Sequence, residues 1–547
     1  MKLSDLTRPP LQQHVKGTGP VTRYRPYYQN LLPPCNQSCP AGENIQRWIS
    51  LVQEGQLEQA FTILTEINPM PSIHGRVCYH PCEGGCNRGH VDTPVQVHSL
   101  ERYLGDMAIE QGWQLPQINA DTGKRILIIG SGPAGLSAAY HLRRQGHAVE
   151  IYEVQDKAGG MMRYGIPAYR LPRDILDAEI KRIEQLGVTI HCNRRVDNVL
   201  HEKQQGQFDA VFIAVGAPLA TQVNIPARDA AKVMDAVSYL KDVEARQAPL
   251  LGRKVAVYGG GNTAMDAART AKRLGADETV IIYRRDRAHM PAHDFEAQEA
   301  LDEGIKINWL STITEVEKNA IRIEKMALDE QGRPQPTGEY ETLDTNAVIL
   351  ALGQQIEANL FDRLDNIAIE DGAVEVDSHF MTSHAGIFAG GDLTPGTRSV
   401  TFATGHGRKA AMNIDAWLNN AIWEKPASSP AIEYQDLHLW YHTQADASQQ
   451  PELPVQQRIS NFAEIIQGLS DSQAKFEASR CYSCGNCFEC DGCFAACPET
   501  AIRILGPGLG YEINYDKCTG CGACVLQCPT HAISLTPLEQ TGQEAQS

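Results

Sequence analysis

The chain has 547 residues, 42% of them hydrophobic, and a net charge of -17 at pH 7. This length exceeds what one hydrophobic core supports and predicts about three or four domains. An acidic chain without a basic stripe disfavours a nucleic-acid partner. No stretch of about 20 apolar residues could cross a bilayer. Because the first residues also lack the apolar core of a signal peptide, we expect a cytoplasmic protein without membrane insertion.

Cysteines gather in two regions of the chain. Of 16 cysteines, five lie between residues 35 and 86 and ten lie between residues 481 and 528. In a reducing compartment such clusters indicate metal binding and not a disulfide framework. Cys192 stands alone in a strand-like run, so we expect a buried apolar side chain there in preference to a redox group. The first region, in residues 1–120, is predicted to be helical with cysteine loops between the helices.

A first dinucleotide-binding unit is predicted from Arg125 onward. An apolar strand leads into Gly130-x-Gly132-x-x-Gly135, a helix follows, and a second strand ends at Glu153. Glycine permits the tight turn at the first position and close approach of a pyrophosphate to the helix N-terminus at the second. The acid at the strand end would accept hydrogen bonds from a ribose. The motif alone is weak evidence, but here the strand, helix and acid all stand at the required spacing.

A second unit of the same kind begins at Arg253. Gly259-x-Gly261-x-x-Ala264 opens its helix, and the following strand ends in a tyrosine followed by Arg284 and Arg285. No acid stands at the ribose position. Guanidinium groups pair bidentately with phosphate, so this pattern favours NADPH over NADH. The alternative is that these arginines are only solvated side chains at a strand end.

A late motif connects the two units. Residues 385–392, AGIFAGGD, place Asp392 after an apolar strand and before a helix that begins near Ser399. This arrangement resembles the flavoproteins with two dinucleotide-binding domains. The resemblance implies that the first unit binds FAD, that Asp392 holds the flavin ribityl chain, and that the inserted second unit binds NAD(P)H. No cysteine lies between Cys192 and Cys481, which excludes a flavin–disulfide relay.

The C-terminal cysteines form two runs with one spacing, C-x2-C-x2-C-x3-C-P. This pattern is typical of bacterial ferredoxins, in which the fourth cysteine of each run ligates the cluster of the other run. A zinc ribbon is a much weaker alternative. One 4Fe–4S cluster is therefore predicted to take Cys487, Cys490, Cys493 and Cys528, and the other to take Cys518, Cys521, Cys524 and Cys497. Cys481 and Cys484 are left without a place in this pattern.

Several segments outside the ferredoxin pattern resemble one family. CPAGENIQRWISLVQEGQLEQAF, GRVCYHPCEGGCNRG and residues 159–173 and 283–292 are similar to the glutamate synthase small subunit. Dihydropyrimidine dehydrogenase and the large subunit of NADH-dependent ferredoxin:NADP oxidoreductase share this similarity, which covers about residues 30–420. The resemblance implies one 4Fe–4S cluster on Cys39, Cys78, Cys82 and Cys86, further FAD contacts from Gly160, Arg163 and Thr401, and an NADP contact from Asn262.

The chain departs from this family at a second N-terminal cluster. The family supplies two of its cysteines from an R-C-x2-C-G motif upstream of Cys35, and this chain has no cysteine there. The same motif occurs at the far end of the chain, as Arg480-Cys481-x2-Cys484-Gly485. We therefore expect Cys481 and Cys484 to return to the N-terminal domain and join Cys35 and Glu101 around a cluster. The alternative is a structural pair of thiols beside the ferredoxin domain.

The expected fold class is α/β with an α-helical N-terminal iron–sulfur domain and a C-terminal α+β two-cluster ferredoxin domain. Between them stand two Rossmann-like domains, one inserted in the other. The expected domains are 1–120 (helical Fe–S), 121–225 and 346–420 (FAD), 226–345 (NADP), 421–478 (a linker with a helix over 461–479) and 479–547 (ferredoxin).

The expected function is an NADPH-linked oxidoreductase with FAD and three or four 4Fe–4S clusters. Its partner would be a ferredoxin or another oxidoreductase subunit, in a heteromeric complex or a homo-oligomer. No acid–base catalytic residue is indicated, because hydride and electron transfer require mainly the placement of cofactors. Two alternatives are a glutamate synthase small subunit, which usually ends after the flavin domain, and a scaffold without turnover, which the intact glycine motifs oppose.

Overall fold

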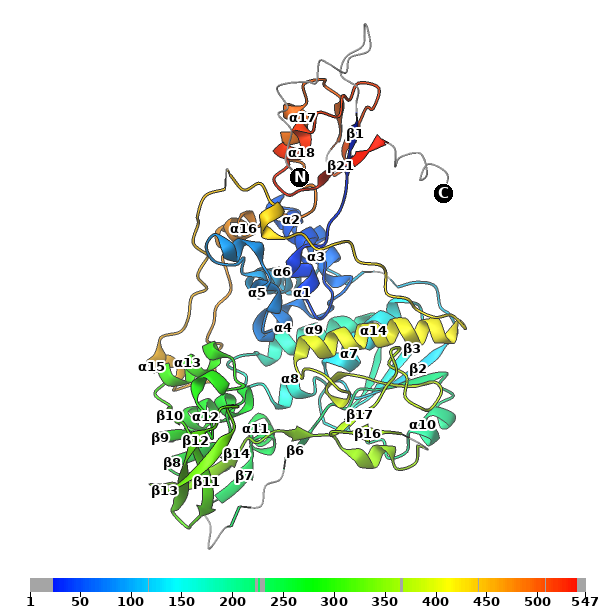
Figure 1. The fold of residues 1–547 in the computed structure, drawn as a ribbon. Coiled ribbons are helices and arrows are strands. Elements are labelled where there is room, and N and C mark those ends of the chain that lie inside the picture. The colour runs from blue at the N-terminus through cyan, green and yellow to red at the C-terminus, as the bar shows by residue number, and fades with distance from the viewer. Residues whose placement is uncertain are drawn as a thin grey trace.

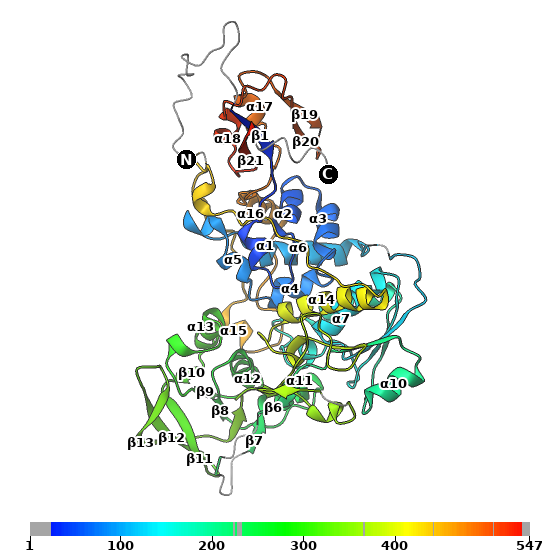
Figure 2. The ribbon, with the colours of Figure 1, turned by 45° about the vertical axis from the view of Figure 1, so that its right-hand side comes forward.

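The computed structural model describes residues 23–116, 118–221, 225–226, 232–364, 367–440, 442–506 and 508–538. Four units are visible (Figure 1): a ferredoxin-like unit at one end, a helical unit in the middle, and two dinucleotide-binding units at the other end. The same order is seen after a 45° turn (Figure 2). Among the described residues, no helix has both the length and the apolar character needed to span a membrane.

The helical unit consists of short helices whose ends carry cysteines. Cys39 and Cys78 are the C-caps of the first and fourth helix. The unit depends on one close helix crossing, since a Cβ added at Gly105 in α6 would lie 2.3 Å from the backbone nitrogen of Ser72 in α4. Its helices are α1 (Pro34–Ser38), α2 (Ile45–Gln53), α3 (Leu57–Thr65), α4 (Pro71–Val77), α5 (Pro81–Gly84) and α6 (Val97–Gln111).

The first dinucleotide unit is a five-stranded parallel sheet in the order β18-β5-β2-β3-β4. Its two main helices cross closely, because a Cβ at Gly407 of α14 would lie 2.2 Å from the carbonyl oxygen of Ala134 in α7. Its main elements are β2 (Arg125–Ile129), α7 (Pro133–Arg144), β3 (Ala148–Tyr152), α8 (Met161–Tyr164), α9 (Arg173–Gln185), β4 (Thr189–His191), α10 (Val199–Gln205), β5 (Ala210–Ile213), β18 (Ile387–Ala389) and α14 (Val400–Leu418).

The second dinucleotide unit is also a five-stranded parallel sheet, in the order β10-β9-β8-β14-β7. An antiparallel sheet of β11, β12 and β13 covers one side of it. Its elements are β7 (Lys232–Asp235), α11 (Ala236–Glu244), β8 (Lys254–Tyr258), α12 (Asn262–Arg273), β9 (Glu278–Ile282), α13 (Asp294–Asp302), β10 (Lys306–Asn308), β11 (Ser311–Val316), β12 (Ala320–Leu328), β13 (Pro334–Asp344) and β14 (Ala347–Leu350).

One expected boundary is wrong. The chain was expected to return to the FAD unit at residue 346, but β14 pairs with β8 and β7 inside the second sheet. The apolar strand completes the buried centre of that sheet. The return comes just afterwards, where β15 (Gln354–Gln355) pairs antiparallel with β6 (Leu219–Ala220). The chain passes between the first and the second dinucleotide unit at these two short strands.

The ferredoxin-like unit contains two similar halves and one strand from the other end of the chain. β1 (Tyr24–Tyr28) pairs antiparallel with β21 (Ile533–Pro537), which the sequence did not predict. The sequence gives no local signal for a partner more than 500 residues away. The other elements are α17 (Gly492–Ala496), β19 (Ile502–Gly506), β20 (Gly510–Ile513) and α18 (Ala523–Gln527).

The segment expected to be a linker is packed along the molecule. It carries α15 (Val455–Arg458) and α16 (Asp471–Ser479). The helix expected over 461–479 is therefore only half as long, because residues 461–470 form no helix and Ser470, with an extended backbone, caps α16 in a capping box. Ala474 and Ala478 of α16 lie in the core of the helical unit, against α2 and α6.

The crossing of α4 and α6 gives a prediction. Gly105→Ala forces its Cβ against the backbone of α4, and such overpacking costs about 1–3 kcal/mol. Hydrogen exchange of the α4 and α6 amides should show a smaller opening free energy by that amount. Gly84→Ala is the control, because a Cβ there meets nothing within 4 Å. Equal exchange in both variants would contradict the prediction.

Candidate functional site

The first glycine loop leaves an open face at the N-terminus of α7. Gly130 has a φ of +101°, and a Cβ there would lie 2.5 Å from the carbonyl oxygen of Ala214. Gly135 must also stay small, because its Cβ would lie 2.0 Å from the Gly130 oxygen. A Cβ on Gly132, the N-cap of α7, would meet nothing within 4 Å. This open space at a helix N-terminus fits the pyrophosphate of FAD.

Three residues expected to contact FAD, Glu153, Gly160 and Arg163, lie around this loop. Glu153 is buried directly after β3, and it accepts a hydrogen bond of 2.9 Å from the Ser131 backbone nitrogen. Gly160 faces the loop, since its Cβ would lie 2.8 Å from the Gly132 Cα. Arg163 is buried, and its Nη1 has no hydrogen-bond partner in the described part of the chain. The loop is therefore lined by polar groups that a dinucleotide could use.

The start of α14 joins the flavin site to the helical unit. Asp392 lies between β18 and α14, and burial raises its pKa to about 6. Ser399 caps α14 by accepting a hydrogen bond of 3.3 Å from the Phe402 nitrogen. Thr401 Oγ1 is buried without a hydrogen-bond partner among the described residues. Burial raises the pKa of the Cys78 thiol to about 12, and the Thr401 hydroxyl, which is near this thiol but makes no regular hydrogen bond with it, lowers that pKa.

The second glycine loop opens into a pocket of 440 Å³. A Cβ on Gly261 would meet nothing within 4 Å, so this helix N-terminus is also open. Arg284 and Arg285 both line the pocket, and Arg285 Nε is buried without a hydrogen-bond partner in the described residues. The pocket therefore offers a guanidinium group to an anion. Ala264 is fully buried where α12 packs on its sheet.

Asn262 has a different place from the one expected. It is the first residue of α12, but its side chain does not line the pocket. Its Nδ2 donates to the Tyr79 hydroxyl at 2.6 Å, and its Oδ1 accepts from the His293 nitrogen at 3.1 Å. The ring of Tyr79 stacks on His293 with centroids 3.8 Å apart. Asn262 therefore connects the second dinucleotide unit to a residue beside Cys78.

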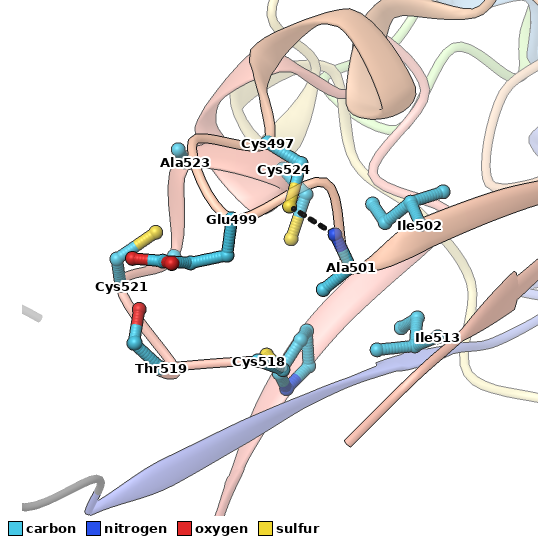
Figure 3. A pocket seen from close by; sticks show the side chains of 12 residues that line it. Cys497, Glu499, Ala501, Ile502, Ile513, Cys518, Thr519, Cys521, Ala523 and Cys524 are labelled. Carbon is cyan, nitrogen blue, oxygen red and sulfur yellow. Dashed lines mark hydrogen bonds between the residues drawn. The ribbon is translucent and has the colours of Figure 1, made fainter. Parts of the chain in front are cut away.

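The ferredoxin-like unit brings its cysteines together in two groups. Figure 3 shows one of them, in which four thiols line a pocket closed on one side by Ile502 and Ile513. The backbone nitrogen of Ala501 donates to Cys497 Sγ at 3.2 Å. This group contains Cys497, Cys518, Cys521 and Cys524. In the other group, burial raises the pKa of Cys487, and the nearby thiols of Cys493, Cys528 and Cys490 raise it further.

A third group of thiols joins the two ends of the chain. Burial raises the pKa of Cys35 well above its usual range, and Cys481, Cys86 and Cys484 raise it further. Burial also raises the pKa of Cys481 and of Cys484 to about 12. Asn87 Nδ2 donates to Cys484 Sγ at 3.6 Å. Cys481 and Cys484 thus return to the N-terminal domain and lie near Cys35. The fourth member of this group is Cys86 and not Glu101.

The fourth group has a carboxylate among thiols. Glu101 raises the pKa of both Cys39 and Cys78 after the larger effect of burial, and both of these thiols act on Cys82. Glu101 Oε1 accepts a hydrogen bond of 2.5 Å from Asn68. The expected sets therefore exchange one member: Cys86 lies with the other group and Glu101 lies here. The reason is local, since Cys86 follows α5 as the N-cap of a short 3-10 helix (Asn87–His90) near Cys484, whereas Glu101 lies 3.9 Å from His74 of α4.

Comparisons with known proteins agree with this arrangement. Residues 124–407 match the pyridine nucleotide-disulphide oxidoreductase family, residues 28–113 match domain II of dihydropyrimidine dehydrogenase with its 4Fe–4S cluster, and residues 511–534 match a 4Fe–4S binding domain. The chain belongs to the NAD(P)H-dependent flavin oxidoreductases related to the glutamate synthase small chain. It has the helical 4Fe–4S domain of this family at its N-terminal side and a ferredoxin-type 4Fe–4S domain at its C-terminal side.

Three relatives show how much of the chain is shared. The NADP(+)-dependent formate dehydrogenase subunit beta of Moorella thermoacetica is 35% identical over 84% of this chain and 71% of its own length. The NADPH-Fe(3+) oxidoreductase subunit beta of Geobacter sulfurreducens is 31% identical over 82% of this chain and 75% of its own. The glutamate synthase small chain of Azospirillum brasilense is 35% identical over 71% of this chain and 86% of its own.

A buried arginine holds the returning segment of this flavin oxidoreductase in place. The Arg480 side chain is only 1% exposed, and it pairs with Glu477 at 2.5 Å and with Asp92 at 3.1 Å. It also donates to the carbonyl oxygen of Thr93 at 2.6 Å. Arg88 supports it by donating to the Arg480 carbonyl oxygen at 2.8 Å. The residues next to Cys481 are thus fixed to the loop between Cys86 and α6.

Sequence reasoning missed several residues that build these groups. Asn68 orients Glu101, and Glu43 shares the same buried pocket, but neither belongs to a recognisable motif. Glu43 is buried, and this burial raises its pKa to about 7. Arg480 had a signal, since it precedes the displaced C-x2-C-G motif. Its partners Asp92 and Glu477 had none, because their role depends on two distant segments meeting.

The anchor gives a prediction. Arg480→Met removes the arginine that pairs with buried Glu477, whereas Asp92 keeps its pair with Arg88, and the loss of a partner from a buried pair costs about 3–5 kcal/mol. Residues 477–486 should exchange amide hydrogens faster and become sensitive to limited proteolysis. Arg503→Met is the control, since Arg503 is 70% exposed and pairs with exposed Glu512. Protection of residues 477–486 in the Arg480 variant at the wild-type level would show that the anchor is unnecessary.

Proposed function

We propose that this chain connects NADPH, through FAD and four 4Fe–4S clusters, to a ferredoxin or a partner oxidoreductase subunit. One observation carries the proposal, namely the meeting of Cys35, Cys86, Cys481 and Cys484. Cys484 stands three residues before Cys487 of the ferredoxin-like unit, and Cys35 is near enough to Cys82 of the set beside the flavin site to raise its pKa. This group therefore connects the thiols of the ferredoxin-like unit to those nearest the flavin site.

The proposed ligand sets follow the four groups of side chains. Each set offers four soft or anionic ligands, as a 4Fe–4S cluster requires. Burial keeps the free thiols protonated, so cluster binding would release protons and stabilise the fold. The sets are Cys487, Cys490, Cys493 and Cys528; Cys497, Cys518, Cys521 and Cys524; Cys35, Cys86, Cys481 and Cys484; and Cys39, Cys78, Cys82 and Glu101.

The residues around the dinucleotides bind and orient them. Bound FAD joins the two-electron chemistry of a nicotinamide hydride to the one-electron chemistry of iron–sulfur clusters. Gly132 would give the pyrophosphate access to the N-terminus of α7, and Asp392 would hold the ribityl chain. Thr401 stands between this site and Cys78, so the flavin would lie next to the set that contains Glu101. Arg284 and Arg285 would select NADPH by its 2'-phosphate.

The partner is proposed from the relatives. Two relatives that match more than four fifths of this chain are the beta subunits of a formate dehydrogenase and of an Fe(3+) oxidoreductase. They favour a heteromeric complex with another oxidoreductase subunit. The glutamate synthase small chain is the second candidate, because one such chain is 35% identical here. That relative covers 71% of this chain, which leaves room for the ferredoxin-like unit outside the match. Glutamate formation with an added synthase large subunit would favour the second candidate.

The iron content tests the four ligand sets. Protein purified without oxygen should contain about 16 Fe per FAD, because four sets each hold four iron atoms. Cys481→Ser together with Cys484→Ser should lower this to about 12. Cys192→Ser is the control and should change nothing, since Cys192 lies outside all four groups. A double variant that retains every iron atom and every cluster signal would refute the third set.

The nucleotide preference tests the arginines. Removing Arg284 and Arg285 by alanine substitution should lower the kcat/KM ratio of NADPH to NADH by about 10- to 100-fold. The estimate follows from about 1.5–3 kcal/mol for hydrogen bonds to a charged group, where 1.4 kcal/mol is tenfold. Arg287→Ala is the control, because Arg287 pairs with Asp294 and does not line the pocket. An unchanged ratio would mean that the arginines do not bind the 2'-phosphate.

A further inference from the structure

The N-terminal strand β1 is part of the ferredoxin-like unit. Five residue pairs connect it to β21, from Tyr24 opposite Pro537 to Tyr28 opposite Ile533. Gln29 extends the contact, since its backbone nitrogen donates to the Ala532 oxygen at 3.0 Å. Among the described strands, β1 is the sheet partner of β21. A strand edge that would otherwise be open is thus closed by a segment from the other end of the chain.

Tyr28 reaches from this strand to a cysteine of the ferredoxin-like unit. Its hydroxyl lies 3.3 Å from Cys493 Sγ. The ring is held by Tyr511, with centroids 6.2 Å apart and planes 20° apart. Tyr511 is itself fixed, because its hydroxyl donates to Asp491 at 2.8 Å, two residues before Cys493. Tyr511 lies in β20, so the position of the Tyr28 hydroxyl is determined by β1 and β20 together and not by free rotation of the side chain.

The two ferredoxin-type groups differ in these contacts. Each has one equivalent backbone donor, Ala501 to Cys497 and Ala532 to Cys528, both at 3.2 Å. The group with Cys493 has in addition two side-chain hydroxyls, that of Tyr28 beside Cys493 and that of Thr530, whose Oγ1 lies 3.6 Å from Cys528 Sγ. Among the described residues, no side-chain hydroxyl is hydrogen-bonded to a thiol of the group that contains Cys497. The shorter of these two hydroxyl contacts comes from β1, a segment outside the repeated halves of the unit.

We propose that Tyr28 donates a hydrogen bond to the Cys493 thiolate and thereby raises the reduction potential of that cluster above the potential of its neighbour. The proposal rests on the ligand sets of the proposed function. A thiolate that ligates iron has no proton, so the phenol must be the donor. Reduction adds one electron and no atom to the cluster, and Tyr28 keeps its proton. The reduced cluster is the more negative state, so a donor to its sulfur stabilises it more.

This asymmetry assigns an order to the two clusters. The group with Cys493 and Cys528 lies beside the returning segment, because Gly485 donates to the Thr530 oxygen at 2.8 Å. The cluster with the higher potential would then be the inner one, next to the set of Cys35 and Cys484. The other cluster would face a partner. The position of the N-terminal strand β1 therefore decides which of the two clusters is reduced first.

The test is a redox titration of the full-length anaerobic protein, followed by electron paramagnetic resonance. Tyr28→Phe keeps the ring on Tyr511 and removes only the donor. In this variant the equilibrium constant for reducing the cluster on Cys493 should fall about tenfold. Its reduction potential should therefore fall by about 59 mV, the value for a one-electron couple. Tyr27→Phe is the control, because Tyr27 lies on the opposite face of β1 and is 40% exposed. An unchanged potential in iron-replete Tyr28→Phe would overturn the proposal.

A second variant covers the case in which Tyr28→Phe loses iron. Replacement of Tyr28 by 3-fluorotyrosine makes the phenol a stronger donor and keeps its size, so the potential of the same cluster should rise. A fluorinated protein with an unshifted potential would overturn the tuning role. Iron analysis separates this result from the proposed function. A wild-type protein without the roughly eight iron atoms of the ferredoxin-like unit would overturn both, whereas full iron without a shift would overturn only the tuning.

Discussion

The burial of Arg480 is the constraint on which the rest of the structure depends. A guanidinium group taken out of water is costly unless its donors are satisfied and its charge is paired. Here Glu477 and Asp92 supply the charge, and backbone carbonyl oxygens accept the remaining hydrogens. These partners exist only where α16 meets the loop before α6. The C-terminal part of the chain is therefore held at one position on the helical unit.

The two ends of the chain each complete the unit formed by the other. Cys481 and Cys484 enter the helical unit, and β1 enters the ferredoxin-like unit. Between these points, Leu31 donates to the Gly485 oxygen at 2.9 Å. A continuous segment from Tyr28 to Cys35 thus runs from one group of thiols to the next. The relative position of the two units is set by backbone pairing, which is more precise than side-chain contact alone.

The helical unit is tied to the second dinucleotide unit in a similar way. Tyr79, next to Cys78, stacks on His293 and accepts a hydrogen bond from Asn262. Arg170 of the first dinucleotide unit pairs with Asp266 of α12 at 2.8 Å and with Glu296 of α13 at 2.5 Å. The nucleotide pocket is therefore held by the unit that carries the thiols and by the flavin unit. Placement of this kind is what hydride and electron transfer require of a protein.

The sequence by itself determined the units and most of their chemical groups. Glycine spacing, the strand ends and the x3-C-P repeats are local patterns, and each predicts a local structure that does not depend on distant contacts. The displaced Arg480-Cys481-x2-Cys484-Gly485 motif even indicated that the chain returns. Only the tertiary structure decided which residues share a group. Cys86 and Glu101 exchanged places, and Tyr28 approached Cys493, because these contacts depend on how α5, α6 and β1 pack against segments hundreds of residues away.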